Sequence, residues 1–243
     1  MMASHDDVLR EQINYYRARA TEYDEWFLRQ GRYDHGDEEN ARWQAEVEQV
    51  AAALDTVLVD ASRRGRLDAL ELAGGTGLWT QRLIGRCDSL TVVDASPETL
   101  AINRDRLGSQ AGQIDYQVAD LFAWRPVRRY DLVFFSFWLS HVPPERFAAF
   151  WSLSHDCLTP DGRVFLVDSL YALNSSAHDH QLDAAATHMT RRLNDGREYR
   201  IVKVFYTPER LRTALAAIGW QADIRATPTY FLAGHAAPAT QSG

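Results

Sequence analysis

Three acidic side chains, Glu71, Asp94 and Asp120, each close a short apolar segment of the sequence. Asp94 lies roughly 20 residues beyond the glycine-rich turn that follows Glu71, a distance at which a carboxylate commonly accepts hydrogen bonds from ribose hydroxyls. Carboxylates accept hydrogen bonds and attract cations, so they suit a ligand with hydroxyl groups and a cationic part. Together the three acids indicate one binding site, although any one of them alone would be weak evidence.

The turn after Glu71 contains Gly74, Gly75 and Gly77. Glycine accepts positive φ and lets a ligand approach the backbone closely, and the N–H groups at the start of the next helix can hold an anionic group. The turn departs from the dinucleotide fingerprint G-x-G-x-x-G, because Thr80 occupies the third glycine position. The carboxylate of Glu71 would also repel a pyrophosphate, so the turn disfavours a dinucleotide.

These side chains converge only if their strands are parallel and end at one edge of a sheet. Strands are expected at residues 68–72, 90–93, 114–119, 130–135 and 164–167, with helical segments between them. This alternation predicts an α/β fold with a parallel sheet. Ligands of such sheets bind just beyond the carboxyl ends of the strands, so the segment from Glu71 to Gly77 is expected to form the floor of the site.

Over about residues 45–235 the chain resembles the class I S-adenosylmethionine-dependent methyltransferases. The matching segments are residues 71–77, 93–96, 119–121, 130–135 and the turn 158–162 before the strand 164–167. Ala73 stands where the family often has the first glycine of its loop, and Arg163 stands where many relatives carry a second glycine of the later turn. The nearest likeness is to the small-molecule branch that includes the ubiquinone and menaquinone methyltransferases.

The resemblance implies a Rossmann-like, mostly parallel seven-stranded sheet with helices on both faces and an N-terminal helical lid. It also implies S-adenosyl-L-methionine as the cofactor, with S-adenosyl-L-homocysteine as the product. Asp94, followed by Ala95, would bind the ribose hydroxyls. Asp120 would accept a hydrogen bond from the adenine amino group, with Leu121 packed on the ring.

The rest of the implied cofactor site lies around the methionine part of the cofactor. The loop residues under it would be Ala73, Gly74, Gly75 and Gly77. Glu71 would lie near the ammonium group or order the loop. Phe135 and Ser136 would end the fourth strand beside the donated methyl group, and Tyr23 would contact the cofactor from the lid.

His141 is the candidate catalytic residue, because the segment 136–144 leaves the carboxyl edge of the sheet over the donated methyl group. Histidine titrates near neutral pH, which suits a general base that deprotonates the acceptor. The alternative is a histidine that forms local hydrogen bonds and orders the loop. An acceptor that is already ionised would need no base.

Tyr16, Trp138 and His141 are the expected substrate contacts. Tyr16 belongs to an aromatic side of the N-terminal segment, whose alternative role is to pack as the face of a surface helix. Arg191, together with Arg192 and Arg197, could bind an anionic substrate group or simply face solvent. The histidines and acids at 178–188 lack the spacing of a zinc site, so no metal is expected.

Three parts of the chain follow: a helical lid at 1–63, a cofactor-binding domain at 64–235 and a disordered tail at 236–243. The lid is expected to have helices at 5–30 and 38–63 around a polar loop at 31–37. Residues 171–195 are expected to form a helix or loop over the sheet edge. A strand at 199–206, a helix at 208–218 and a last strand within 220–232 complete the domain.

Composition limits the partners. The net charge of −7 and the lack of a basic run disfavour a nucleic acid, and no segment is apolar and long enough for a membrane. The two cysteines, Cys87 and Cys157, are expected as buried thiols of a cytoplasmic protein. A homodimer is a candidate assembly.

The predicted function is therefore methyl transfer from S-adenosylmethionine to an oxygen or nitrogen atom of a small organic metabolite, by in-line SN2 displacement. Two alternatives remain at this point. One is an NAD(P)-dependent oxidoreductase, whose fold begins with a similar strand, turn and helix. The other is a protein that binds S-adenosylmethionine without catalysis.

Overall fold

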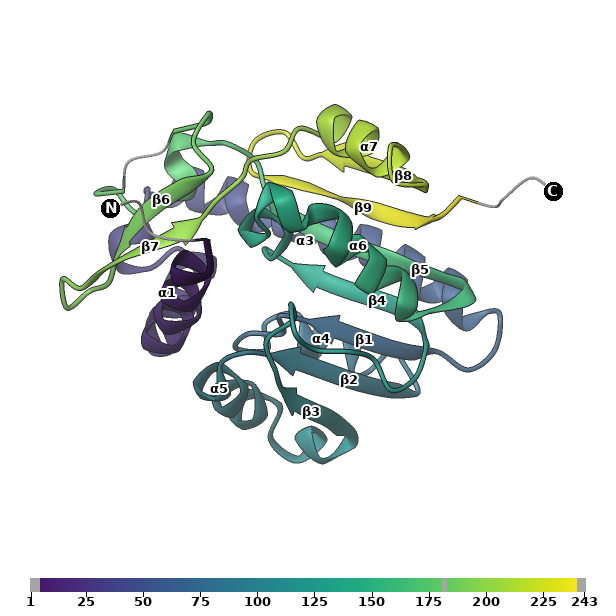
Figure 1. The fold of residues 1–243 in the computed structure, drawn as a ribbon. Coiled ribbons are helices and arrows are strands. Elements are labelled where there is room, and N and C mark those ends of the chain that lie inside the picture. The colour runs from purple at the N-terminus through teal and green to yellow at the C-terminus, as the bar shows by residue number, and fades with distance from the viewer. Residues whose placement is uncertain (1–4, 181–182, 240–243) are drawn as a thin grey trace.

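The structure is a computed structural model that describes residues 5–180 and 183–239. Its centre is a seven-stranded sheet of order β3-β2-β1-β4-β5-β9-β8 (Figure 1). The strands are β1 (Asp68–Leu72), β2 (Ser89–Asp94), β3 (Ile114–Val118), β4 (Tyr130–Ser136), β5 (Leu158–Ser169), β8 (Trp220–Ala226) and β9 (Phe231–Pro238). The first five are parallel, and β9 is antiparallel to both β5 and β8. The predicted Rossmann-like fold is confirmed.

Strand β4 shows why the sheet carries helices on both faces. Its side chains alternate, as the period of two requires: Val133 and Phe135 enter one core cluster, and Leu132 and Phe134 enter the other. Helices α6 (Phe147–Asp156) and α7 (Pro208–Ala216) contribute to the first cluster. Helices α3 (Asp37–Ser62), α4 (Thr80–Leu83) and α5 (Pro97–Leu107) contribute to the second.

The N-terminal segment covers the carboxyl ends of the parallel strands (Figure 1). It consists of α1 (His5–Ala18), the 3₁₀ turn Ala20–Glu22, α2 (Tyr23–Phe27) and a second 3₁₀ turn, Gly31–Tyr33. The expectation of one helix over 5–30 is wrong, because the chain tightens into the 3₁₀ turn after α1 and ends α2 at Phe27. The expected second helix is α3, which packs on the sheet. The division of the chain into a 1–63 lid and a 64–235 domain stays a prediction.

A small hairpin packs beside the lid at the edge of the sheet. It consists of β6 (His188–Arg192) and β7 (Glu198–Val202), which pair antiparallel, and α1 packs against β7. The expectation of a helix or loop over 171–195 is therefore wrong for residues 188–192, which form β6. The strand expected at 199–206 begins at Glu198 and ends at Val202, and the chain then runs past Lys203 toward α7.

The C-terminal prediction also needs correction. Residues 236–238 complete β9, and Ala236 is fully buried between Val164 of β5 and Ala222 of β8. They are ordered because both neighbours pair with them. The last strand, expected within 220–232, is β9, which ends at Pro238, and β8 occupies residues 220–226. Ala239 donates from its N–H to the Gly219 carbonyl at 2.8 Å, and residues 240–243 of the expected tail lie outside the described residues. None of the described helices has the length and apolar character that crossing a membrane requires.

Candidate active site

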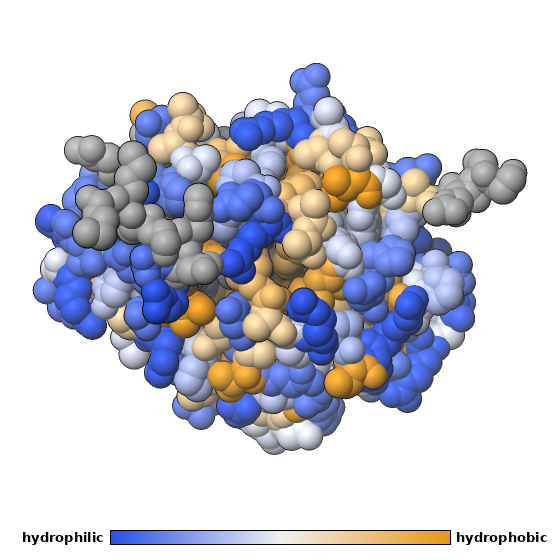
Figure 2. Space-filling model, in the orientation of Figure 1, coloured by the Kyte–Doolittle hydropathy of each residue, from blue (hydrophilic) through white to orange (hydrophobic). Residues whose placement is uncertain are grey.

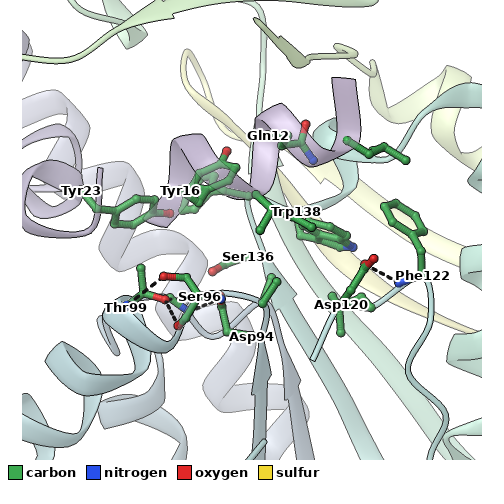
Figure 3. Close-up of a pocket in the computed structure, with 17 residues that line it drawn as sticks. Gln12, Tyr16, Tyr23, Asp94, Ser96, Thr99, Asp120, Phe122, Ser136 and Trp138 are labelled. Atoms are coloured by element: carbon green, nitrogen blue, oxygen red, sulfur yellow. Dashed lines mark hydrogen bonds between the residues drawn. The ribbon is translucent and has the colours of Figure 1, made fainter. Parts of the chain in front are cut away.

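The sheet-edge cavity lies over the carboxyl ends of β1, β2 and β4 and under α1 (Figure 3). It holds about 740 Å³ of space free of protein atoms, including the open solvent at its mouth. The expected site residues that line it are Tyr16, Tyr23, Ala73, Gly75, Asp94, Ala95, Asp120, Leu121, Ser136 and Trp138. Figure 2 shows a hollow near the middle of this face of the molecule.

Asp94 anchors the glycine loop to the start of α5. Its Oδ2 accepts a hydrogen bond from the Gly75 N–H at 2.9 Å, and its Oδ1 accepts one from the Ser96 N–H at 2.8 Å. Burial raises the pKa of Asp94, and these N–H donors oppose the rise. Ser96 also caps α5 by accepting from the Thr99 N–H. The carboxylate is thus held in one orientation at the cavity wall.

Asp120 stands at the other end of the sheet-edge cavity. Its Oδ1 accepts a hydrogen bond from the Phe122 N–H at 3.0 Å, which orients the carboxylate. Trp138 lies on this side, with its ring 5.7 Å from that of Phe122. The indole Nε1 of Trp138 is buried and has no hydrogen-bond partner in the described structure. A ligand in the cavity can supply the missing acceptor.

Glu71 does not line the sheet-edge cavity. It is 1% exposed, and its Oε2 accepts a hydrogen bond from the Thr80 hydroxyl at 2.6 Å. Burial raises the pKa of Glu71 to about 8. Asn103 completes the network, since its Nδ2 donates to Thr80 Oγ1 at 2.8 Å and to the Gly75 carbonyl at 3.3 Å. Of the two roles expected for Glu71, its contacts match the ordering of the loop.

The same network explains the loop sequence. Thr80, which replaces the third glycine of the dinucleotide fingerprint, is the hydrogen-bond partner of Glu71. Gly77 has a φ of 89°, and a Cβ there would lie 2.8 Å from Asn103 Cγ. A Cβ on Gly74 would lie 2.3 Å from Val92 Cγ1. Ala73 has a φ of 55°, a conformation that glycine adopts more easily, which is consistent with the glycine common at this position in the family.

Phe135 does not reach the sheet-edge cavity. Its ring is 1% exposed and packs against Phe150, 5.2 Å away, and Trp151, 6.0 Å away, on α6. The alternation of side chains along β4 points this residue into the core, while Ser136 and Phe137 line the cavity. The expected place of Phe135 beside the methyl group is therefore corrected.

His141 is 5% exposed, and both its ring nitrogens have partners. Nδ1 lies 2.7 Å from the Val202 carbonyl, and Nε2 lies 2.8 Å from the Tyr16 hydroxyl. Because a carbonyl only accepts, Nδ1 carries the proton and Nε2 accepts from Tyr16. Burial, with the charge of Lys203, holds the pKa of His141 well below its usual value. The neutral imidazole thus joins α1 to β7.

A second cavity, the lid cavity, adjoins the first and shares Tyr16, Tyr23 and Phe137 with it. It holds about 520 Å³, again including open solvent. Its cationic side chains are Arg19, Arg191 and Lys203, and His141 also lines it. Arg192 and Arg197 instead form surface ion pairs with Glu198 and Asp195. The sequence argument missed Lys203, which no motif marks.

The lid is joined directly to the glycine loop. The Thr76 hydroxyl donates to Asp24 Oδ1 of α2 at 2.6 Å. Arg106 of α5 forms an ion pair with Asp24 and donates from Nε to the Thr76 carbonyl at 2.7 Å. We call Asp24, Thr76 and Arg106 the lid latch. It holds Tyr23, the neighbour of Asp24, over both cavities.

The histidines of the 178–188 segment form other contacts. His178 Nε2 lies 2.7 Å from the Asp34 carbonyl, and His180 Nδ1 lies 2.7 Å from Arg191 Nη1. Within residues 5–180 and 183–239, no three His, Cys, Asp or Glu side chains are grouped as metal ligands would be.

Comparison with known proteins identifies the ligand class. Residues 69–162 match a family described as a methyltransferase domain. The structure titled "DhpI-SAH complex structure" is 34% identical over 98% of this chain and 100% of that chain, with a TM-score of 0.74. The structure titled "DhpI-SAM-HEP complex" is 36% identical over the same shares, with a TM-score of 0.75. A comparison with curated proteins finds no match.

A more distant structure shares the fold. It is the 1,6-didemethyltoxoflavin-N1-methyltransferase of Burkholderia thailandensis, 17% identical over 98% of this chain and 92% of that chain, with a TM-score of 0.58. The sheet-edge cavity fits S-adenosylmethionine, with acids at two strand ends, an exposed loop backbone at Gly75 and the unmatched Trp138 Nε1. The cofactor is thus S-adenosylmethionine rather than a nicotinamide dinucleotide. The chain is an enzyme that belongs to the class I S-adenosylmethionine-dependent methyltransferases.

Proposed function

We propose that this enzyme transfers a methyl group to an oxygen or nitrogen atom of a small organic molecule bound in the lid cavity, by in-line displacement. The observation that carries the proposal is the junction of the two cavities, because Tyr16, Tyr23 and Phe137 line both. An acceptor in the lid cavity would meet the cofactor across this junction. Positioning of that kind supplies much of the rate of a two-substrate reaction.

In the sheet-edge cavity, Asp94 would bind the ribose hydroxyls, and Asp120 would accept from the adenine amino group. Trp138, expected in the acceptor wall, lies beside Phe122 and does not line the lid cavity. We therefore assign Trp138 to the adenine end, with Leu121. Ser136 and the backbone at Ala73 and Gly75 would face the methionine part.

When bound, S-adenosylmethionine supplies an electrophilic methyl group on a sulfonium. The chain's own contribution is to exclude water and to orient the acceptor. Tyr16 and Tyr23 form an aromatic wall between the two cavities, and aromatic faces attract cations. The lid latch holds this wall in place.

His141 acts as a positioning residue in this proposal. Its Nε2 lone pair accepts the Tyr16 hydroxyl, so a proton from the acceptor would reach it only through Tyr16. The general-base role expected from the sequence is therefore the less favoured alternative. The general-base alternative predicts that His141→Ala loses turnover and that its pH profile changes between pH 6 and 9. The positioning role predicts instead that the KM for the acceptor changes.

The cationic lining of the lid cavity favours an acceptor with an anionic group over a neutral quinol. The likeness to the ubiquinone and menaquinone methyltransferases stays a prediction. The homodimer is also a prediction, and light scattering of the purified protein would test it.

The experiment is a transfer assay with S-adenosylmethionine labelled in the methyl group. The purified enzyme is incubated with panels of small alcohols, phenols, amines, carboxylic acids and phosphonic acids, and the products are identified by mass spectrometry. The proposal predicts a label on oxygen or nitrogen of a small acceptor. Label found only on carbon, or on no small molecule while the enzyme binds S-adenosylmethionine, would contradict it.

A further inference from the structure

Trp138 brings a hydrogen-bond donor without a partner to the sheet-edge cavity. Its ring lines the cavity, and its indole Nε1 is buried with no acceptor in the described part of the chain. Buried polar atoms of native proteins are nearly always paired, and an unpaired one lowers stability. The missing acceptor is therefore to be sought in the cavity that the ring lines.

Other indole groups of the chain differ from Trp138 in one of two respects. Trp79 and Trp151 also have a buried Nε1 without a described partner, but neither lines the sheet-edge cavity. Trp124 has a partner, since its Nε1 donates to Gln117 Oε1 at 2.8 Å. Trp138 combines an unpaired donor with a place in the cavity wall, and this combination points to a ligand.

The Trp138 ring is held by its neighbours. Its centre lies 5.7 Å from that of the Phe122 ring and 6.3 Å from that of the Phe150 ring. Its main-chain carbonyl accepts a hydrogen bond from the His141 N–H at 2.8 Å. Figure 3 shows the indole nitrogen directed toward the side of the cavity on which the carboxylate of Asp120 lies. The donor of Trp138 and the acceptor of Asp120 thus face one end of the cavity.

Phe122 links these two groups. Its N–H donates to Asp120 Oδ1 at 3.0 Å, and its ring packs beside that of Trp138. An acceptor next to a donor is what adenine requires, because its amino group donates and the ring nitrogens on either side of that group, N1 and N7, accept. In protein–DNA contacts the amide of asparagine or glutamine supplies both partners from one side chain. Here two side chains offer them separately.

We propose that Trp138 determines specificity for the base of the cofactor: its Nε1 donates to a ring nitrogen of adenine beside the amino group, while Asp120 accepts from that amino group. Hypoxanthine would turn a carbonyl oxygen toward the carboxylate of Asp120, so the pair discriminates against it. This inference rests on the proposed placement of the adenine at Asp120. It adds a polar contact to that placement and does not depend on the acceptor.

The first test removes the two partners in turn. S-Adenosylhomocysteine and its 1-deaza and 7-deaza analogues, in which carbon replaces one ring nitrogen, are titrated in a calorimeter. The analogue that lacks the paired nitrogen is expected to bind wild type about tenfold more weakly than S-adenosylhomocysteine does. Trp138→Phe keeps an aromatic ring but loses the donor. It should bind S-adenosylhomocysteine about tenfold more weakly than wild type does, and that analogue with no further loss.

Trp124→Phe is the matched control, because the Trp124 donor is already paired with Gln117. It is expected to keep the wild-type ratio of affinities for the three ligands. The proposal is overturned if, for both analogues, the loss of affinity relative to S-adenosylhomocysteine is the same in Trp138→Phe as in wild type. Binding of both analogues to wild type as tight as that of S-adenosylhomocysteine also overturns it.

Nuclear magnetic resonance of the wild-type enzyme with nitrogen-15 in its indole groups gives a second readout, which needs no variant to fold. S-Adenosylhomocysteine is expected to move the Trp138 Nε1–H signal downfield, and the analogue without the paired nitrogen to leave it near its position in the free enzyme. An equal downfield shift with all three ligands would assign the bond to a protein group such as Asp120. That result would overturn the proposal.

These titrations contain no methyl acceptor, so their failure would leave the proposed transfer to a small molecule intact. The labelled-methyl assay could fail in turn without affecting the contact between adenine and Trp138. S-Inosyl-L-homocysteine tests the placement on which the inference rests. It is expected to bind at least about tenfold more weakly than S-adenosylhomocysteine. Equal affinity would show that the base does not lie at Asp120 and would overturn the inference.

Discussion

The Tyr16 hydroxyl donates a hydrogen bond to His141 Nε2 at 2.8 Å, and these two residues lie 125 positions apart in the sequence. Tyr16 belongs to α1, and His141 follows β4. Gln12 strengthens the connection one turn earlier on α1, since its side chain donates to the His141 carbonyl and accepts from the Val202 N–H. The lid is therefore fastened to the loop after β4 at Tyr16, which lines both cavities.

Tyr16→Phe is expected to raise the KM for the acceptor while the affinity for S-adenosylmethionine changes little. The substitution leaves the buried His141 Nε2 without a donor, which costs about 1–3 kcal/mol of stability. Thermal unfolding and separate titrations of the two ligands measure these effects. Tyr15→Phe, on the same helix, is the control. An equal loss in the control would show that the effect is general to α1.

The pH dependence of stability reports on His141. The pKa of the folded imidazole is well below its usual value, so between that pKa and about 6.5 the unfolded chain binds a proton that the folded chain does not. The free energy of unfolding is therefore expected to fall as the pH is lowered from 7 to 5. His141→Asn should show a shallower fall in denaturant titrations. His155→Asn, at an exposed histidine of α6, should keep the wild-type slope.

The lid latch predicts that cofactor binding depends on the lid. Arg106→Gln removes the ion pair to Asp24 and the bond to the Thr76 carbonyl. It is expected to weaken S-adenosylmethionine binding about tenfold, mainly through faster dissociation, because Tyr23 loses its support. Stopped-flow fluorescence measures the rate. Arg104→Gln, where Arg104 stacks on Tyr116 in the same helix, is the matched control.

If Arg104→Gln and Arg106→Gln weaken S-adenosylmethionine binding equally, the effect belongs to α5 as a whole and not to the lid latch. Unchanged dissociation in Arg106→Gln would show that the lid does not retain the cofactor.

Glu71→Gln is expected to become progressively more stable, relative to wild type, as the pH rises. Burial raises the folded pKa of Glu71 to about 8. The stability that its proton contributes is complete below the unfolded pKa of about 4.3 and is lost as the pH rises through the folded pKa. Urea titrations at pH 5, 7 and 9 measure the difference. Glu48→Gln, at an exposed glutamate of α3, should show no such trend.

Asp94→Asn is expected to weaken S-adenosylmethionine binding about tenfold or more, because the amide offers one acceptor oxygen where the carboxylate offers two. One of the bonds to Gly75 and Ser96 is lost with it. Asp115→Asn, on the exposed side of β3, is the control, and calorimetry is the measurement. Wild-type affinity in Asp94→Asn would remove the ribose assignment.

The sheet and its ligand edge could be predicted because their signals are local. Strand β4 contains the apolar run 132–135. Glu71 and Asp94 lie at the ends of β1 and β2, and the glycines after β1 mark a turn with a ligand. Phe135 and its neighbour Ser136 were both predicted beside the methyl group, but only Ser136 lines the cavity, because the side chain of Phe135 points into the core. Side chains alternate along a strand, so an error of one position reverses the face.

The lid cavity could not be predicted, because long-range contacts assemble it. Arg19 and Lys203 are separated by most of the chain, and no spacing rule connects them. The break between α1 and α2 has no proline or glycine to mark it. Ala236 has little intrinsic preference for a strand, and its pairing with β5 and β8 decides its conformation.

The most direct test of the account is a crystal structure of the enzyme with S-adenosylhomocysteine and an acceptor that the transfer assay identifies. The account predicts the nucleoside in the sheet-edge cavity, between Asp94 and Asp120. It predicts the acceptor in the lid cavity, with the atom that is methylated facing the sulfur past Tyr16 and Tyr23. An acceptor bound outside the lid cavity, or with no oxygen or nitrogen directed at the sulfur, would contradict it.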